Sequence, residues 1–145
     1  MFVHATSVAL KAGARWRGVL LRGPSGSGKS DLALRLIDEG GRLIADDQTH
    51  LARKGHALIA SPPPVLAGMI EVRGIGVVKL PRGRLLAAAP LALLVDLVRA
   101  EAVERMPEPA YEMLQDVKLP RLVLAPFEVS TVAKLRLALA RAAEA

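Results

Sequence analysis

Residues 23–30 of the chain read Gly-Pro-Ser-Gly-Ser-Gly-Lys-Ser. The spacing Gly-x-x-x-x-Gly-Lys-Ser is typical of a phosphate-binding loop (P-loop), in which glycines let successive backbone N–H groups converge on phosphate oxygens. The lysine would reach the outer phosphates, and the last serine would offer its hydroxyl to Mg²⁺. The motif predicts that a nucleoside triphosphate is bound by Gly23, Pro24, Ser25, Gly26, Ser27, Gly28, Lys29 and Ser30.

The segments that flank this loop have the order that it requires. Residues 2–10 and 16–22 are strand-like and are separated by a turn-prone segment, so they predict a hairpin that leads into the loop. From Lys29 the apolar positions recur with the period of a helix, until Gly40 and Gly41 stop it. Strand, glycine loop and helix therefore follow one another.

The remainder of the chain alternates short apolar runs with turn signals. Residues 99–118 are charged and contain two prolines, which predicts a surface segment with some helix near residues 111–116. Together the elements predict one α/β domain over residues 1–145. We expect strands at residues 43–45, 91–98 and 122–124, paired strands within 49–61 and 69–80, and a closing helix capped by Ser130.

The composition excludes several classes of protein. Hydrophobic residues make up 52% of the chain and aromatic residues 3%, and the chain has no cysteine for a disulfide or a thiolate metal site. No apolar run approaches the roughly 18 residues of a membrane span, and the first residues do not resemble a leader. The net charge of +6 is scattered, with few aromatic rings for bases to stack on. We expect a cytoplasmic protein that binds neither a membrane nor nucleic acid.

Acidic residues beyond the loop are candidates for the chemistry. Asp46 and Asp47 follow a predicted strand, where a carboxylate can accept a proton from an attacking hydroxyl or hold a metal ion, but aspartates are equally typical of a turn. Neighbouring side chains on extended backbone point opposite ways, so two different roles are expected. Glu71 and His4 lie between apolar neighbours, which by itself indicates a solvent-facing acid and a half-buried structural histidine.

The order of these motifs resembles the C-terminal catalytic domain of HPr kinase/phosphorylase, an enzyme that phosphorylates a seryl hydroxyl of the phosphocarrier HPr and can remove that phosphate. The likeness begins with Val3-His4 and the loop and continues loosely to residue 124. Its most specific parts are Ala-Asp-Asp at residues 45–47 and Ile-Glu-Val-Arg-Gly-Ile-Gly at residues 70–76. The resemblance implies a P-loop-containing α/β fold similar to PEP carboxykinase, with a mixed β-sheet core and flanking helices.

The resemblance also assigns catalytic roles. It implies that His4 sits beside Asp46, that Asp46 takes the proton from the seryl hydroxyl, and that Lys29 holds phosphate. It further implies that Arg105 is the active-site arginine of the family.

The cofactors and partners are likewise implied by the resemblance. ATP is the implied phosphate donor, and Ser30, Asp47 and Glu71 are the implied ligands of Mg²⁺. The implied partner is HPr or an HPr-like carrier, in regulation of the phosphotransferase system, and a homo-oligomer is compatible with the family.

Three departures from the family pattern affect the expected activity. We expect a form without the N-terminal regulatory domain of longer family members, the loop between Leu80 and Leu91 is short, and residues 126–131 replace a Pro-x-Arg-Pro-Gly-Arg stretch tied to dephosphorylation. We expect a truncated relative in which serine phosphorylation is favoured over the phosphorylase reaction. The alternatives are a small-molecule P-loop kinase, for which an arginine-rich lid is expected, and a nucleotide-sensing module that needs no catalytic carboxylate.

Overall fold

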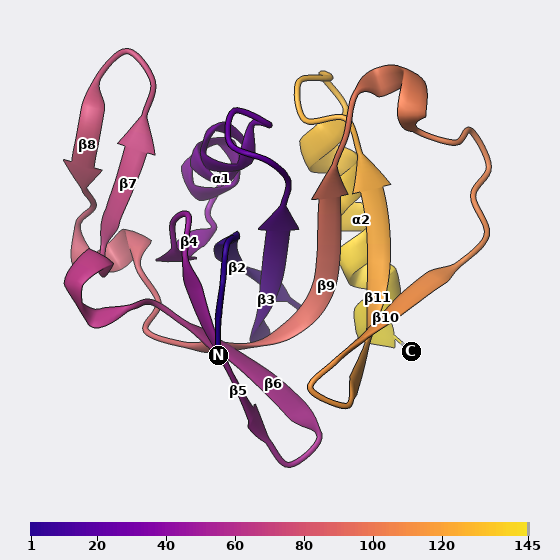
Figure 1. The fold of residues 1–145 in the computed structure, drawn as a ribbon, viewed down its shortest axis with the longest axis horizontal. Coiled ribbons are helices and arrows are strands. Elements are labelled where there is room, and N and C mark those ends of the chain that lie inside the picture. Colours follow the sequence, from indigo (N-terminus) through magenta and orange to yellow (C-terminus); the bar gives the residue numbers. More distant parts are fainter. Residues whose placement is uncertain (145) are drawn as a thin grey trace.

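The computed structural model describes residues 1–144, in which a mixed β-sheet carries two α-helices (Figure 1). Short 3-10 segments lie in three of the connections, at Pro64–Leu66, Arg82–Arg84 and Ala100–Ala102. The strands and helices are β1 Phe2–Val3, β2 Thr6–Ala12, β3 Arg15–Arg22, α1 Lys29–Asp38, β4 Arg42–Ala45, β5 Thr49–Lys54, β6 Ala57–Ser61, β7 Met69–Val72, β8 Gly76–Lys79, β9 Ala89–Leu97, β10 Ala110–Leu114, β11 Val117–Leu124 and α2 Thr131–Glu144.

Strand β9 joins the parts of the main sheet. It pairs in parallel with β3 and β11, and its first residues, Ala89 and Pro90, pair antiparallel with β6. The sheet continues from β3 through β2 to β4, and from β6 through β5 to β1, while β10 pairs with β11. The carboxyl ends of the parallel strands β3, β9 and β11 therefore meet at one edge, which is where α/β sheets of this kind bind ligands.

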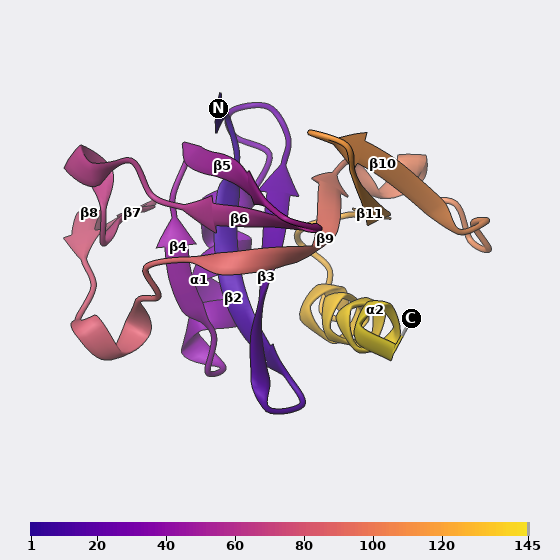
Figure 2. The ribbon, with the colours of Figure 1, turned by 90° about the horizontal axis from the view of Figure 1, so that it is seen from below.

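The central strands are buried on both faces, as their continuous apolar runs require. Val19 and Leu21 of β3 belong to the core beneath α1 and α2, whereas Leu20 between them belongs to the core beneath β4 to β6. Figure 2 shows α2 and the β5–β6 hairpin on opposite sides of β9. The predicted mixed sheet with flanking helices is confirmed, and both helices lie on one face.

Helix α1 begins and ends as its sequence predicts. It starts at Lys29 directly after Gly28, and it ends at Asp38, with Gly40 at a φ of 104°. The N–H of Gly40 donates to Ile37 O at 3.1 Å, and the N–H of Gly41 donates to Leu36 O at 2.9 Å. These two bonds form a Schellman motif, which satisfies carbonyls that the end of the helix would otherwise leave free.

The prediction of helix at residues 111–116 is wrong, because β10 occupies residues 110–114. This strand pairs along its whole length with β11, and the two-residue turn Gln115–Asp116 has positive φ values of 46° and 63°. A turn of that twist favours a hairpin. Pairing with β11 overrides the helix-forming side chains of Glu112 and Met113, and β11 begins at Val117 rather than near Leu122.

The other predicted elements are confirmed within a few residues. Both early hairpins and the β7–β8 pair form, and the closing helix starts at Thr131, one residue after Ser130. Its predicted stripe is buried at Val132, Leu135 and Leu139. Within residues 1–144, none of the helices has the length and apolar character to cross a membrane.

Candidate functional site

The phosphate loop, residues 23–30, connects β3 to α1 at the sheet edge where the parallel strands end. Gly28 is the N-cap of α1 and has a φ of 99°, a backbone conformation that favours glycine. A Cβ at this position would lie 2.9 Å from the Phe127 ring and 3.0 Å from Cβ of Pro126. Both the backbone and the packing therefore require glycine at the point where α1 presents its free N–H groups.

Lys29 is held against its own loop. Its side chain is buried, with 6% of the residue exposed, and Nζ donates to the carbonyl oxygens of Gly23 at 2.6 Å and Pro24 at 3.1 Å. The loop thus closes around the cation of its own lysine, and a phosphate oxygen bound by Lys29 would take the place of these carbonyls. The positive charge and the N-terminus of α1 act on the same small volume.

Asp46 is the hub of hydrogen bonds that join four elements. Its Oδ1 accepts from the hydroxyls of Ser30 at 2.7 Å and Thr6 at 3.1 Å, and its Oδ2 accepts from the backbone N–H of Glu71 at 2.9 Å. These contacts tie the end of β4 to α1, β2 and β7. Asp46 is therefore a fixed carboxylate beside the loop, with both oxygens engaged.

Asp47 is placed quite differently. Its backbone has a φ of 66°, its N–H donates to Thr6 Oγ1 at 3.1 Å, and its side chain is 62% exposed. Its Oδ1 lies 3.5 Å from Nε2 of His4. The resemblance implied that His4 sits beside Asp46, but the structure instead places His4 against Asp47, because the chain turns at this residue.

The donors at this site fit a magnesium ion that also takes phosphate and water. Among residues 1–144, no three His, Asp or Glu side chains gather to form a metal cage. Mg²⁺ in phosphoryl-transfer sites is commonly held by one or two protein groups and by substrate phosphates, so such a cage is not required. The Ser30 hydroxyl and the Asp46 carboxylate, 2.7 Å apart at the start of α1, supply suitable oxygen ligands.

Among the described residues, two predicted site residues do not contribute side-chain hydrogen bonds to this cluster. Glu71 contacts Asp46 through its backbone, and its exposed side chain stays a predicted metal ligand. Arg105 lies in the exposed segment between residues 103 and 109, and within the described part of the chain no hydrogen bond or ion pair joins it to the loop. Sequence reasoning missed Thr6, whose buried hydroxyl donates to the Asp46 carboxylate and accepts from the Asp47 N–H.

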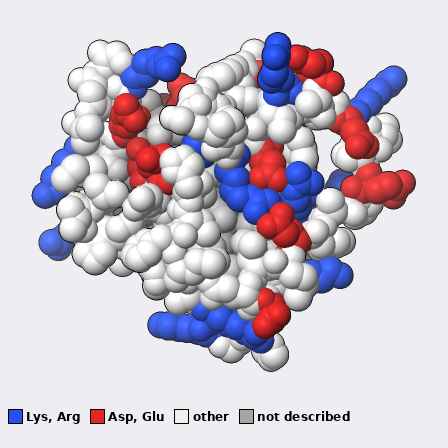
Figure 3. Space-filling view, in the orientation of Figure 1, with Lys and Arg blue, Asp and Glu red and all other residues white. Residues whose placement is uncertain are grey.

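An ion network, Arg22, Asp96, Glu112 and Arg121, supports the start of the loop. Arg22 immediately precedes Gly23 and binds Asp96 at 2.8 and 3.1 Å and Glu112 at 2.7 and 2.8 Å. Arg121 donates to Asp96 at 2.6 Å. Figure 3 shows interleaved acidic and basic side chains over β9 and β11.

These contacts shift the pKa values of two members of the ion network. Hydrogen bonds to Glu112 and Asp96 raise the pKa of Arg22 against the opposing effect of burial. The hydrogen bonds from Arg22 lower the pKa of Glu112 below its ordinary value of 4.5, which partial burial alone would raise. Both groups therefore stay charged over a wider pH range. A lone acid inside the apolar run of β9 was the signal that could have predicted this network.

The sheet topology and the loop geometry are those of a known kind of nucleotide-binding domain. A glycine-rich loop between a parallel strand and a helix, with a buried lysine, a hydroxyl and a fixed carboxylate at its end, is the arrangement of a P-loop domain that binds a polyphosphate. The profile of the family described as HPr Serine kinase C-terminal domain matches residues 8–137. The chain belongs to this family.

Individual relatives agree with this assignment. HPr kinase/phosphorylase of Leptothrix cholodnii is 39% identical over 118 residues, which cover 74% of this chain and 36% of that protein. The enzyme of the same name from Geobacillus thermodenitrificans is 33% identical over 121 residues, with 74% and 38% covered. The chain thus spans less than two fifths of the length of these relatives. Among solved structures, the HPr(Ser) kinase/phosphatase from Coxiella burnetii aligns with a TM-score of 0.83 and 25% identity over 99% of this chain and 90% of that chain.

Proposed function

We propose that this protein transfers the γ-phosphoryl group of ATP to a seryl hydroxyl of HPr or an HPr-like carrier, in the cytoplasm and with Mg²⁺ as cofactor. The observation that carries the proposal is that two adjacent carboxylates beside the phosphate loop lie in different environments. Asp46 is fixed against Ser30, whereas Asp47 is exposed and paired with His4. A kinase needs both a metal-side and an acceptor-side carboxylate.

Asp47 is the proposed base. It is the carboxylate that an incoming protein can reach, because Asp46 has both oxygens engaged by Ser30, Thr6 and Glu71. This assignment revises the role that the resemblance gave to Asp46. His4, 3.5 Å from Asp47, positions the carboxylate and can share the proton that it receives.

The proposed transfer step has a simple balance. The seryl hydroxyl gives its proton to Asp47 while its oxygen forms a bond to the γ-phosphorus, and the bond from that phosphorus to the β–γ bridging oxygen breaks to release ADP. Lys29 leaves the loop carbonyls and neutralises charge on the transferred group. Ser30 and Asp46 would hold Mg²⁺, which would supply further charge neutralisation at the phosphates. The role of Arg105 stays a prediction.

The family and its relatives support the acceptor as well as the reaction. The matching family is described as a serine kinase of HPr, and the relatives carry the name HPr kinase/phosphorylase. We assign phosphorylation and not dephosphorylation to this protein, because residues 126–131 differ from the family's stretch tied to dephosphorylation. Within these residues, Phe127 packs against the loop at Gly28.

The test compares Asp47→Asn with the native protein. We expect the rate of seryl phosphorylation of HPr to fall by about 10²–10⁴-fold, because the general base is lost, while Mg-ATP affinity stays within about twofold. Phosphate incorporation is measured with labelled ATP and HPr from the same source, and nucleotide affinity is measured by calorimetry.

Asp46→Asn is the matched comparison, because it makes the same chemical change one residue earlier. It places an amide where Oδ2 accepts the Glu71 N–H, and it removes the charge beside Ser30, so Mg-ATP affinity should fall together with turnover. If Asp47→Asn retained native turnover, or if the native protein failed to phosphorylate HPr, the proposed function would be wrong.

A further inference from the structure

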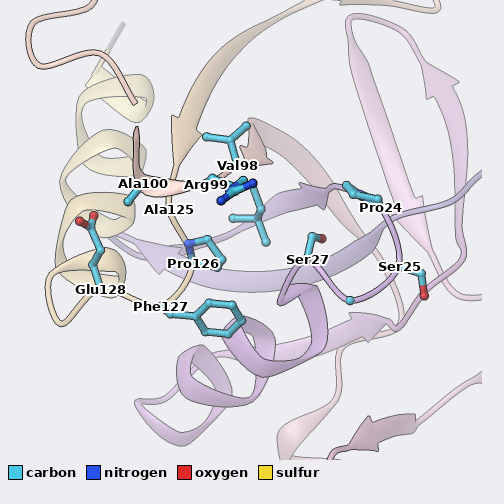
Figure 4. Close-up of a pocket in the computed structure, with 12 residues that line it drawn as sticks. Pro24, Ser25, Ser27, Val98, Arg99, Ala100, Ala125, Pro126, Phe127 and Glu128 are labelled. Atoms are coloured by element: carbon cyan, nitrogen blue, oxygen red, sulfur yellow. The ribbon is translucent and has the colours of Figure 1, made fainter. Parts of the chain in front are cut away.

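A pocket of about 520 Å³ opens beside the phosphate loop (Figure 4). Its walls are residues 24–27 of the loop, residues 97–100 at the end of β9 and residues 125–128 after β11. Most of these side chains are apolar, and the volume lies within the range of about 300–1,000 Å³ that small-molecule sites occupy. None of the catalytic groups considered above lines it.

The position of the pocket determines which part of a nucleotide it can take. If the phosphates of a nucleotide bind at the N-terminus of α1, the nucleoside can extend along the sheet edge in either of two directions. On the β2–β4 side lie Asp46, Asp47 and His4, which are the groups for the transferred phosphate and its acceptor. On the β9–β11 side lies the apolar pocket, so the nucleoside end must point there.

We propose that this pocket holds the base and ribose of the bound nucleotide, with the Phe127 ring stacked on the base. This inference rests on the proposed function. It adds the site that binds the nucleoside, called the nucleoside seat below, and the residue that stacks on the base. Phe127 is 70% exposed although its ring edge approaches Gly28. Figure 4 shows Phe127 and Arg99 reaching the pocket from the ends of β11 and β9, opposite Pro24 and Ser27 of the loop. An exposed aromatic ring beside a phosphate site offers a stacking face for a base.

Along residues 125–128 the pocket recognises a base by van der Waals contact more than by a pattern of hydrogen bonds, because three backbone carbonyls there are already engaged. The carbonyl of Ala125 already accepts from Thr131 Oγ1 at 2.7 Å, that of Glu128 accepts from Thr131 N at 3.2 Å, and that of Pro126 accepts from Arg35. Apolar lining discriminates between similar ligands weakly, so ATP and GTP should bind with affinities within about tenfold of each other.

Calorimetric titration with Mg-ATP and with Mg-tripolyphosphate separates the nucleoside seat from the phosphate site. Phe127→Ala should weaken Mg-ATP by about 10- to 100-fold, the loss expected for one base–aromatic stack, and leave tripolyphosphate affinity within twofold (about the limit for an unperturbed loop). Ala100→Trp, at an exposed wall position, should fill the pocket and produce the same selective loss. Tyr111→Ala removes another exposed ring, on β10, and should change neither affinity.

The outcomes distinguish this inference from the function on which it rests. If both Phe127→Ala and Ala100→Trp bound Mg-ATP with native affinity, the proposed nucleoside seat would be wrong. The proposed phosphate site at the loop would be unaffected by that result. Equal losses of ATP and tripolyphosphate would also overturn the nucleoside seat, because the substitutions would then act through the loop. A preference of more than about a thousandfold for one purine would contradict recognition by contact. Failure of the native protein to bind either ligand would overturn the proposed function and this inference with it.

Discussion

At Gly28 a methyl side chain would be disfavoured both by the backbone conformation and by a steric clash. The backbone has a φ of 99°, and the added carbon would lie 2.9 Å from the Phe127 ring. Gly28→Ala should therefore destabilise the fold by about 2–3 kcal/mol, the sum of strain and overpacking, and weaken Mg-ATP binding at least tenfold (about 1.4 kcal/mol). Urea unfolding and calorimetry measure the two effects.

Gly13→Ala is the control for backbone strain alone. Gly13 also has a positive φ, of 66°, but no atom lies within 4 Å of the added carbon. We expect a loss of about 1 kcal/mol and unchanged Mg-ATP affinity. Equal effects of the two substitutions would mean that the contact with Phe127 contributes nothing.

At the residue scale, the sequence predicted Lys29, Ser30 and Asp46, which the fold brings close to the loop, but neither Thr6 nor the different placement of the two aspartates. The spacing of residues 23–30 is enough to place Lys29 and Ser30, because that loop has one working geometry. The expectation that neighbouring carboxylates point opposite ways assumed extended backbone. Asp47 has a positive φ, so the chain turns there, and only the folded structure shows that His4 meets Asp47.

Among the elements, β3, β9, β10 and β11 are held together by the ion network, and this contribution should depend on pH. The Arg22 hydrogen bonds lower the pKa of Glu112 below 4.5, so folding stabilises the carboxylate form. The contribution is fully present above pH 4.5 and is lost as the pH falls through the lowered pKa of the folded state. Glu112→Gln should lower the unfolding temperature most at neutral pH, with the difference from the native protein shrinking below pH 4.5.

Glu101→Gln makes the same substitution in a solvated ion pair. Glu101 binds Arg99 at 2.9 Å, but the two side chains are 69% and 88% exposed. Such pairs contribute about 0–1 kcal/mol, so this variant should unfold near the native temperature at every pH. A pH-independent effect of Glu112→Gln would contradict the role given to its charge.

At the element scale, prediction succeeded where the local pattern and the tertiary environment agree. Helix α1 has an amphipathic period, a glycine start and a glycine stop, and its bounds were nearly correct. The prediction for β10 failed because residues 110–114 favour helix locally and become a strand only by pairing with β11. The ion network was missed because its members are far apart in the chain, with Arg22 and Asp96 separated by 74 positions.

The whole molecule should respond to its ligand as one cooperative unit. Mg-ATP at 100 times its dissociation constant would stabilise the native state by about 2.7 kcal/mol, which raises the unfolding temperature of a domain of this size by roughly 5–10 °C. Lys29→Ala should abolish this shift, and Lys54→Ala, at the exposed end of β5, should retain it. Differential scanning calorimetry tests both, and a full shift in Lys29→Ala would contradict the role of this lysine.

The place of β9 in the sheet also has a consequence for how the protein is made on the ribosome. The loop leaves the ribosome early, but the strand that pairs with β3 follows about seventy residues later, and the hydrogen-bonded partners Arg22 and Asp96 are 74 positions apart. Contacts between such distant segments form late and slowly. A nascent chain that ends before β9 therefore lacks the neighbour that fixes the loop, and nucleotide can act as a folding ligand only once synthesis has passed that strand.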